Sequence, residues 1–362
     1  MQMARTTLGP FEITILLHPQ GCRTYLVKEP DSGEALVLDP HLDAVPALLQ
    51  AAVGSRVRWI VDSHTHADHP SGAGALAALD TSIRVAHAKS RHAGVTHLPD
   101  DGESLSLGDR SLTVRHTPGH TPDHLVLEGE GLLFSGDSLL IGSVARADFI
   151  GGDAGELYDS IHDVMLPLED DTILLPGHDY EGQTTSTVGV ERASNAWLRI
   201  EDRDEFVKLL SANTPPEPAN MPTLLSLNRE GVEIPTQMSG EQLVQIVEKG
   251  GAGSVIDVRT QKEVEQAHVP GTRAIPMDQI PSRLRDVLAT PAPRMLLCHT
   301  GQRSEAVRRW LVQQGISGVT NVSGGIVGYA RARGRVVGGK PAEIATAGGC
   351  AAGGCAAPGP GA

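Results

Sequence analysis

The 362-residue sequence lacks the features that are typical of membrane proteins, of secreted proteins and of disulfide-rich proteins. No apolar run approaches the ~20 residues that a membrane-spanning helix needs. The first residues, MQMARTTLGPFEITILL, lack the charged start, the long apolar stretch and the small-residue cleavage site of a secretion signal. The four cysteines, Cys22, Cys298, Cys350 and Cys355, are scattered rather than spaced like a disulfide framework. These absences predict a reduced, cytoplasmic protein with no membrane partner.

Basic residues are scarce in the first two-thirds of the chain. Residues 1–238 contain 35 Asp and Glu against 16 Lys and Arg, whereas residues 239–340 contain 8 against 14. The formal net charge of −14 argues against a nucleic-acid partner. The change of sign reflects either different partners or only different solvated surfaces. Together with a length that exceeds what one hydrophobic core usually serves, it predicts two domains.

Metal-binding residue types recur at the ends of predicted strands in the first part of the chain. His64 follows VRWIVDS, His120 follows LTVRHTPG, Asp137 follows GLLFSG, and His178 follows TILLPG. Active sites commonly collect on loops at strand ends. Seven residues of this kind lie in these loops: His64, His66, Asp68, His69, His120, Asp137 and His178. Together they predict a metal site.

Two metal arrangements fit this set. In a two-zinc site all seven residues would bind metal, Asp137 would bridge the two ions, and the pair would activate water for hydrolysis. In a one-iron site, His64, His120 and Asp137 would form a facial triad with adjacent positions open for a thiolate and dioxygen. The remaining side chains would then hold the ligands in place. The motifs alone leave both arrangements open.

The motifs HTHADH, TPGHT, SGD and PGHDY resemble the metallo-β-lactamase fold family across about residues 10–235. The resemblance implies an αββα sandwich with the metal site at one edge of the two sheets. The segment SGDSLLIGSVARADF and the later PGHDY and STV resemble the persulfide dioxygenase branch of that family. This branch implies one Fe(II) per chain, held by His64, His120 and Asp137. It also implies that Arg146 contacts the substrate and that five residues surround the ligands: His66, Asp68, His69, His178 and Tyr180.

The second part of the chain follows the proline-rich stretch SANTPPEPANMP, residues 211–222. Predicted strands such as SVIDVR and RMLLCH alternate with predicted helices, an order that favours a parallel sheet. Ser239 and Gln242 have the spacing of a helix-capping box. Cys298 falls between a strand and a helix, where backbone N–H groups, the helix dipole and the charge of Arg303 all favour a nucleophilic thiolate.

The loop CHTGQRS, with VIDVR, HVPGTRAIP and NVSGGIVGY, resembles the rhodanese family across about residues 237–335. The resemblance implies that Cys298 carries sulfur as a persulfide, that Arg303 is catalytic, and that Gly301 and Ser304 bind the transferred group. We therefore predict a domain at 1–235, a rhodanese domain at 236–338 and a disordered tail at 339–362. The roles of Cys22, Cys350 and Cys355, and homo-oligomerisation, stay open.

The sequence thus predicts an α/β enzyme of two domains. The first would oxidise a low-molecular-weight thiol persulfide, with glutathione persulfide as the leading candidate, using O2 to give sulfite and thiol. The second would transfer sulfur to or from thiosulfate or sulfite. The alternative is a two-zinc, glyoxalase II-like thioester hydrolase fused to a sulfur carrier. A third interpretation, in which the rhodanese part only senses or docks persulfides, is disfavoured by the complete loop from Cys298 to Ser304.

Overall fold

The computed structural model describes the greater part of the chain, as follows: residues 1–78, the backbone of 84–86, and residues 95–179, 182, 185–212, 214, 220–230, 235–314, 316 and 318–338. The chain forms two compact units. Unit 1 comprises Met1–Glu217 with Leu225–Val232, and unit 2 comprises Pro218–Leu224 with Glu233–Ala362. The predicted domain boundary at residue 235 stays a prediction, and the predicted disordered tail lies outside the described residues.

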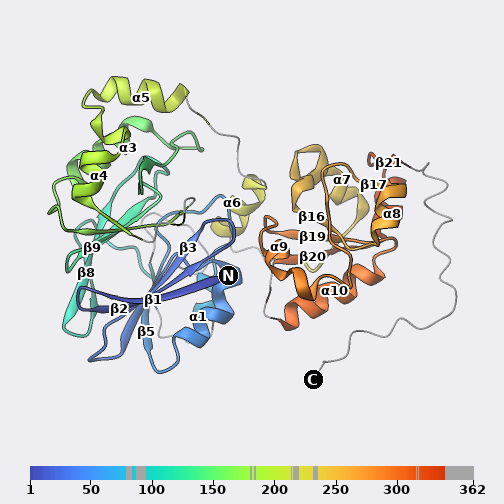
Figure 1. Ribbon diagram of the computed structural model, residues 1–362, viewed down its shortest axis with the longest axis horizontal. Helices are drawn as coiled ribbons and strands as arrows, with labels where there is room; N and C mark the ends of the chain where they lie inside the picture. The colour runs from blue at the N-terminus through green and yellow to red at the C-terminus, as the bar shows by residue number, and fades with distance from the viewer. Residues whose placement is uncertain are drawn as a thin grey trace. The chain divides into compact units, whose positions relative to one another are not determined.

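Two six-stranded sheets form the centre of unit 1 (Figure 1). The first contains, in spatial order, β1 (Gln2–Leu8), β2 (Phe11–Leu17), β3 (Arg23–Lys28), β4 (Glu34–Leu38), β5 (Arg56–Val61) and β6 (Arg84–Ala86). The second contains β14 (Ser186–Thr187), β13 (Ile173–Pro176), β10 (Leu132–Gly136), β9 (Leu125–Gly129), β8 (Arg110–His116) and β7 (Ser104–Leu107). A short hairpin, β11 (Leu139–Leu140) with β12 (Ser143–Val144), follows β10.

Alternating apolar residues of both sheets meet in one core. Phe11, Tyr25 and Val61 from the first sheet pack with Leu127 and Phe134 from the second. The opposite faces of the sheets are covered by short helices, so that apolar residues are buried on both sides of each sheet. This arrangement confirms the predicted αββα sandwich.

The helices that cover unit 1 belong to two groups. The first sheet is covered by the 3₁₀ turn η1 (Leu42–Ala44), α1 (Val45–Ala51) and α2 (Ala73–Ala77). The second sheet is covered by α3 (Ala154–Ser160), the π-helical turn η2 (Ile161–Met165), α4 (Val188–Ser194), the 3₁₀ turn η3 (Trp197–Arg199) and α5 (Arg203–Ala212). Helix α6 (Met221–Glu230) contributes residues to both units, 221–224 to unit 2 and 225–230 to unit 1.

Unit 2 contains a five-stranded parallel sheet, as the alternation of strands and helices predicts. Its order is β15 (Gln237–Met238), β20 (Val319–Val322), β19 (Arg294–Leu297), β16 (Val255–Asp257) and β18 (Arg273–Ala274). The accompanying elements are α7 (Gly240–Glu248), η4 (Gly251–Ser254), α8 (Gln261–Gln266), β17 (Ala267–His268), η5 (Pro281–Arg283), α9 (Leu284–Leu288), α10 (Gln302–Gln313), α11 (Gly325–Arg331) and β21 (Val337–Gly338). The capping box of Ser239 and Gln242 at the start of α7 is confirmed.

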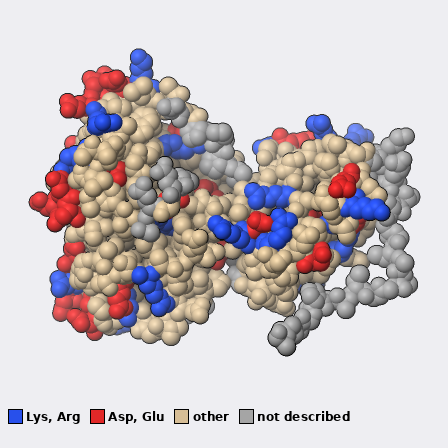
Figure 2. All heavy atoms as spheres, viewed as in Figure 1, with Lys and Arg blue, Asp and Glu red and all other residues tan. Residues whose placement is uncertain are grey.

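Successive residues of β19 point to opposite faces of this sheet. Met295 and Leu297 pack in one apolar cluster, and Leu296 and Cys298 pack in the other. Cys298 therefore lies at the end of a strand that is buried on both faces, as expected for a parallel sheet covered by helices. Figure 2 shows the acidic side chains of unit 1 gathered along one flank, and clusters of basic side chains on the visible face of unit 2.

A buried ion pair stabilises the centre of unit 2. The side chains of Asp257 and Arg259 are 0% and 3% exposed, and the guanidinium donates to both carboxylate oxygens at 2.9 and 2.6 Å. The same guanidinium donates to the backbone oxygen of Ala267. Removing one partner of such a pair leaves an uncompensated buried charge, which is strongly destabilising.

We expect Asp257→Ala to lower the free energy of unfolding of unit 2 by about 3–5 kcal/mol. The matched control is Asp286→Ala, because Asp286 pairs with Arg283 at the surface, where both side chains are at least 40% exposed. That change should cost less than about 1 kcal/mol. Urea unfolding, monitored through hydrogen exchange of peptides from unit 2, measures the stability loss of each variant. Equal losses in the two variants would contradict a stabilising role of the buried pair.

Candidate metal centre and cysteine loop

His64, His120 and Asp137 converge at one edge of the sandwich. They follow β5, β8 and β10, and all three are buried. Their potential ligand atoms lie within 4.8 Å of one another, and the Nε2 atoms of both histidines are 4.0 Å from Oδ2 of Asp137. Two imidazoles and one carboxylate are a donor set that suits a divalent transition metal. The predicted triad is therefore brought together by the fold.

The hydrogen bonds behind the two imidazoles direct their Nε2 lone pairs to the centre. His120 Nδ1 lies 2.7 Å from the backbone oxygen of Arg146, which accepts only, so Nδ1 carries the proton. The hydroxyl of Ser63 donates to the carboxylate of Asp39 at 2.9 Å and therefore accepts from His64 Nδ1, also at 2.9 Å. Both rings thus have the tautomer that metal ligation requires.

His178 lies between two carboxylates. Its Nδ1 is 2.8 Å from Oδ1 of Asp137, and its Nε2 is 3.0 Å from Oδ2 of Asp68. Burial lowers the pKa of His178, but Asp137, Cys22 and Asp68 outweigh burial and hold that pKa well above its usual value. Both ring nitrogens therefore donate protons, and neither has a lone pair for a metal. The contact with Oδ1 leaves Oδ2 of Asp137 facing the two histidines.

Asp68, His69 and Cys22 form a second polar group beside His178. The two oxygens of Asp68 contact His69 Nδ1 and the sulfur of Cys22, both at 3.2 Å. Burial and the charge of Asp68 raise the pKa of the Cys22 thiol, but His178 and His69 outweigh them and lower it to about 6. Asp68 is thus engaged on both oxygens by neighbouring side chains of the protein.

His66 lies beside His64 but faces other groups. Its Nε2 is 3.3 Å from Oδ1 of Asp39 and 3.7 Å from Oδ1 of Asp62. Burial lowers the pKa of His66, but these two carboxylates outweigh burial and raise it well above its usual value. Nε2 of His66 thus faces Asp39 and Asp62, and this orientation favours a site built from His64, His120 and Asp137.

The sequence-based predictions missed further residues of this centre besides Ser63 and Asp39. His124 stacks on His64, and its Nε2 accepts the backbone N–H of Asp137 at 3.0 Å. Burial and the neighbouring His120 lower the pKa of His124 to about 3, so it stays neutral and can accept. Asn228 donates to the backbone oxygens of His66 and His69, both at 2.8 Å. The motif GHTPDH could have indicated His124, whereas no local pattern marks Asn228.

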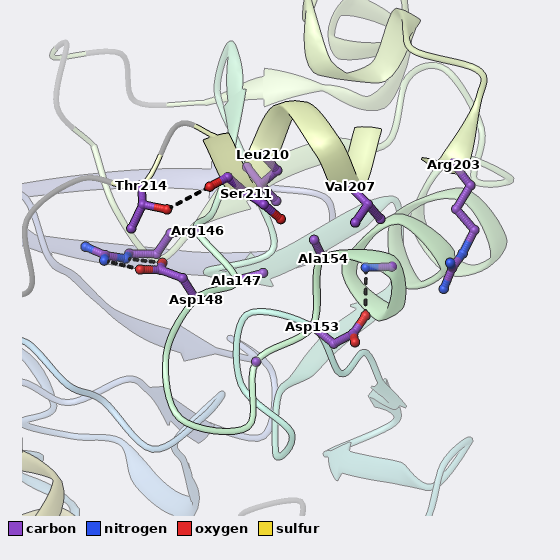
Figure 3. A pocket seen from close by; sticks show the side chains of 12 residues that line it. Arg146, Ala147, Asp148, Asp153, Ala154, Arg203, Val207, Leu210, Ser211 and Thr214 are labelled. Carbon is purple, nitrogen blue, oxygen red and sulfur yellow. Dashed lines mark hydrogen bonds and ion pairs between the residues drawn. The ribbon is translucent and has the colours of Figure 1, made fainter. Parts of the chain in front are cut away.

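Arg146 lines a cavity of about 420 Å³ beside the metal centre (Figure 3). Its guanidinium makes two hydrogen bonds with Asp148, at 2.5 and 2.6 Å, and lies 4.6 Å from the ring centre of Phe149. Figure 3 shows this pair at one end of the cavity and Arg203 at the other. Because the backbone oxygen of Arg146 holds His120, the cavity wall and the metal centre share one peptide group. Tyr180, also predicted here, lies outside the described residues.

In unit 2, Cys298 opens a tight loop before α10. Its sulfur is 3.0 Å from the backbone nitrogen of Gly301 and 3.3 Å from the hydroxyl of Ser304. Gly301 has a φ of 95°, a conformation that favours glycine. Arg303 makes two hydrogen bonds with Glu263 of α8, at 2.6 and 2.9 Å. The fold thus brings Gly301 and Ser304 to Cys298, while the guanidinium of Arg303 is engaged by Glu263. Cys350 and Cys355 lie outside the described residues.

Comparisons with known proteins identify a known family in each of the two parts of the chain. Residues 19–178 match the model of the metallo-beta-lactamase superfamily, and residues 239–332 match that of the rhodanese-like domain. Over 234 residues the chain is 36% identical to persulfide dioxygenase ETHE1 of Homo sapiens. The matched region covers 63% of this chain and 92% of that protein. No helix among the described residues is long and apolar enough to cross a membrane.

A solved structure and a hydrolase relative complete the comparison. The crystal structure of ETHE1 from Myxococcus xanthus matches with a TM-score of 0.56 and 28% identity, covering 63% of this chain and 98% of that one. A hydroxyacylglutathione hydrolase of Polaromonas sp. is 36% identical over 163 residues, 43% of this chain and 61% of that protein. The chain therefore belongs to the persulfide dioxygenase family within the metallo-β-lactamase superfamily and carries a C-terminal rhodanese-like domain.

Proposed function

We propose that unit 1 oxidises a low-molecular-weight thiol persulfide with one Fe(II) per chain, and that glutathione persulfide is its substrate. One persulfide, one dioxygen and one water give one thiol and one sulfite, with release of two protons. The observation that carries the proposal is the orientation of His66 and His178 toward carboxylates. This leaves His64, His120 and Asp137 as a three-residue metal site, which supports one metal rather than two.

The residues of the site suit Fe(II). Two imidazoles with free Nε2 lone pairs and a carboxylate match the facial triad that leaves positions open for co-substrates. Iron held by His64, His120 and Asp137 would supply the redox chemistry for the reaction of dioxygen with the persulfide. The protein holds the ligands from behind through Ser63, the backbone of Arg146, and His178. His178 also keeps a proton between Asp137 and Asp68.

The cavity beside Arg146 provides room for the part of the substrate that carries the persulfide. It is lined by charged groups at both ends and by apolar residues such as Val207 and Leu210 between them. A thiol carrier with carboxylate groups could bind the guanidinium of Arg146 through charge-assisted hydrogen bonds. Asp148 holds that guanidinium in place in the free protein, because it binds two of its nitrogens.

Unit 2 supports sulfur transfer through Cys298. The thiolate of Cys298 would attack the outer sulfur of thiosulfate, forming a new S–S bond while the old one breaks and sulfite leaves with the electron pair. The reverse step would join sulfite to the sulfur carried on Cys298 and release thiosulfate. The N–H of Gly301, 3.0 Å from the sulfur, would stabilise the negative charge in either direction. Sulfite and persulfide are shared by both units, which gives a chemical reason for joining them.

The purified protein should contain one iron per chain and consume oxygen only when persulfide is supplied. Asp137→Ala should abolish iron binding, whereas Asp68→Ala should weaken it by about 10–100-fold, because Asp68 acts through His178. Metal analysis and an oxygen electrode measure these outcomes. Two zinc ions per chain, with thioester hydrolysis and no oxygen uptake, would instead establish the hydrolase, and equal metal loss in both variants would favour a two-metal site.

Arg146→Ala should raise the KM for persulfide while leaving the iron content unchanged. The reason is that the side chain faces the cavity, whereas the backbone oxygen that holds His120 is retained. Arg110→Ala, which removes a surface pair with Glu130, is the control and should change neither quantity. Unchanged kinetics in an Arg146→Ala enzyme with full iron would contradict a role in substrate binding.

Cys298→Ser should abolish sulfur transfer between thiosulfate and thiols, since a serine cannot form a persulfide. Iron content and persulfide oxidation should persist, because Cys298 lies in unit 2. With wild type, sulfite would leave partly as thiosulfate, and with the variant sulfite should accumulate. Quantifying sulfite and thiosulfate against oxygen consumed tests this. An unchanged ratio would indicate the reverse direction, in which thiosulfate and a thiol supply persulfide to unit 1.

A further inference from the structure

A chain of hydrogen bonds connects Cys298 to a surface carboxylate of α10. The hydroxyl of Ser304 lies 3.3 Å from the sulfur of Cys298 and 2.6 Å from Oδ1 of Asn321. Nδ2 of Asn321 donates to Oε1 of Gln237 at 2.8 Å, and Nε2 of Gln237 donates to Glu305 at 2.7 Å. Gln237 and Asn321 are register partners on β15 and β20, so the two amides face each other.

The carboxylate of Glu305 sets the direction of every bond in this chain. Hydrogen bonds from Arg308 and Arg309, together with the one from Gln237, lower the pKa of Glu305 to about 2, although burial opposes them, so Glu305 only accepts. Gln237 must therefore turn its NH2 group toward Glu305 and its oxygen toward Asn321. The hydroxyl of Ser323 lies 2.9 Å from that oxygen and can donate to it, which is compatible with the same orientation.

The orientation of Asn321 decides where the proton of Ser304 goes. Since the NH2 group of Asn321 is held by Gln237, its oxygen faces Ser304 and accepts the single hydroxyl proton. The hydroxyl oxygen is then left with lone pairs toward the sulfur of Cys298. Ser304, Asn321 and Cys298 are at most 4% exposed, so competition from water is small. At Ser304 this arrangement suits a protonated sulfur that donates to the hydroxyl, whereas the N–H of Gly301 faces the sulfur as a donor, at 3.0 Å.

We propose that Asn321 is a positioning residue that competes with the sulfur of Cys298 for the hydroxyl proton of Ser304. When Cys298 loses its proton, the hydroxyl turns to the sulfur, and the buried oxygen of Asn321 loses its donor, which costs free energy. Asn321 thereby favours the protonated thiol and delays formation of the nucleophile. The role deepens the proposed sulfur transfer and rests on it, but the protonation of Cys298 can be measured without any transfer.

Other charged groups near Cys298 come from several elements. They are His299 of the loop, Arg303 of α10, Glu263 of α8, and the ion pair of Asp257 and Arg259 at the end of β16. All of them are unchanged in variants of Asn321 and Gln237. Their influence on the sulfur therefore cancels when such variants are compared with wild type.

The test is the pH dependence of alkylation of Cys298 by iodoacetamide, followed by mass spectrometry of the peptide that contains it. Asn321→Leu removes the acceptor at similar volume, so the midpoint of the alkylation profile should move down by about one pH unit. Gln237→Leu, at an exposed position, releases the amide of Asn321 and should move the midpoint in the same direction by less. Ser323→Ala leaves the bond between Gln237 and Asn321 in place and should leave the midpoint unmoved.

Combined variants separate the proposal from a structural effect. In a Ser304→Ala background the hydroxyl is absent, so adding Asn321→Leu should no longer move the midpoint. An unmoved or raised midpoint in both Asn321→Leu and Gln237→Leu would overturn the proposal, as would a shift that persists without Ser304. Should Asn321→Leu not fold, Gln237→Leu alone decides the matter. Absence of sulfur transfer in wild type, with these midpoints moving as expected, would instead contradict only the proposed function.

Discussion

The candidate metal centre of unit 1 depends on the placement of His178 between the buried carboxylate of Asp137 and the half-buried carboxylate of Asp68. Asp68 and Asp137 would repel each other in this water-poor edge of the sandwich, and a positively charged ring between them offsets that repulsion. His178 follows β13 of the second sheet. Just before it, the backbone oxygen of Gly177 accepts the N–H of Arg23, which begins β3 of the first sheet, at 2.8 Å. The two sheets are therefore joined at the point where the metal ligands converge.

A serine directs a proton in each of the two sites. Ser63 donates to Asp39, and this makes it an acceptor for the ring of His64. Ser304 donates to Asn321, and this makes it an acceptor for the thiol of Cys298. In both cases a carboxylate determines the direction in which the single hydroxyl proton points. Asp39 does so directly at Ser63, and Glu305 does so at Ser304 through two amide side chains. In both sites, hydrogen bonds to the serine thus influence where the proton lies between that serine and its neighbour.

Much of this could be predicted, because the signals are local. Short stretches of sequence contain the signals for the strand ends, for the order of the ligand-type residues and for the capping box of Ser239 and Gln242. The motifs alone left the choice between one metal and two open, and the proposal of one metal draws on the orientation of the ring of His66, which no local pattern marks. Asn228 was equally hidden, because it binds backbone oxygens about 160 residues earlier in the chain. Strand β1, whose residues are nearly all exposed, offers no alternation of apolar residues to detect.

A change of the side chain of Arg146 and a change in the length of its loop would have different consequences. Its backbone oxygen fixes the ring of His120, whereas its side chain belongs to the cavity. Under the proposed function, exchange of the side chain would alter which thiol carrier is accepted without disturbing the candidate metal ligands. An insertion or deletion in this segment would instead misplace the oxygen and affect every substrate alike. Relatives with different carriers are expected to differ in the identity of this residue and to agree in the length of the loop that contains it.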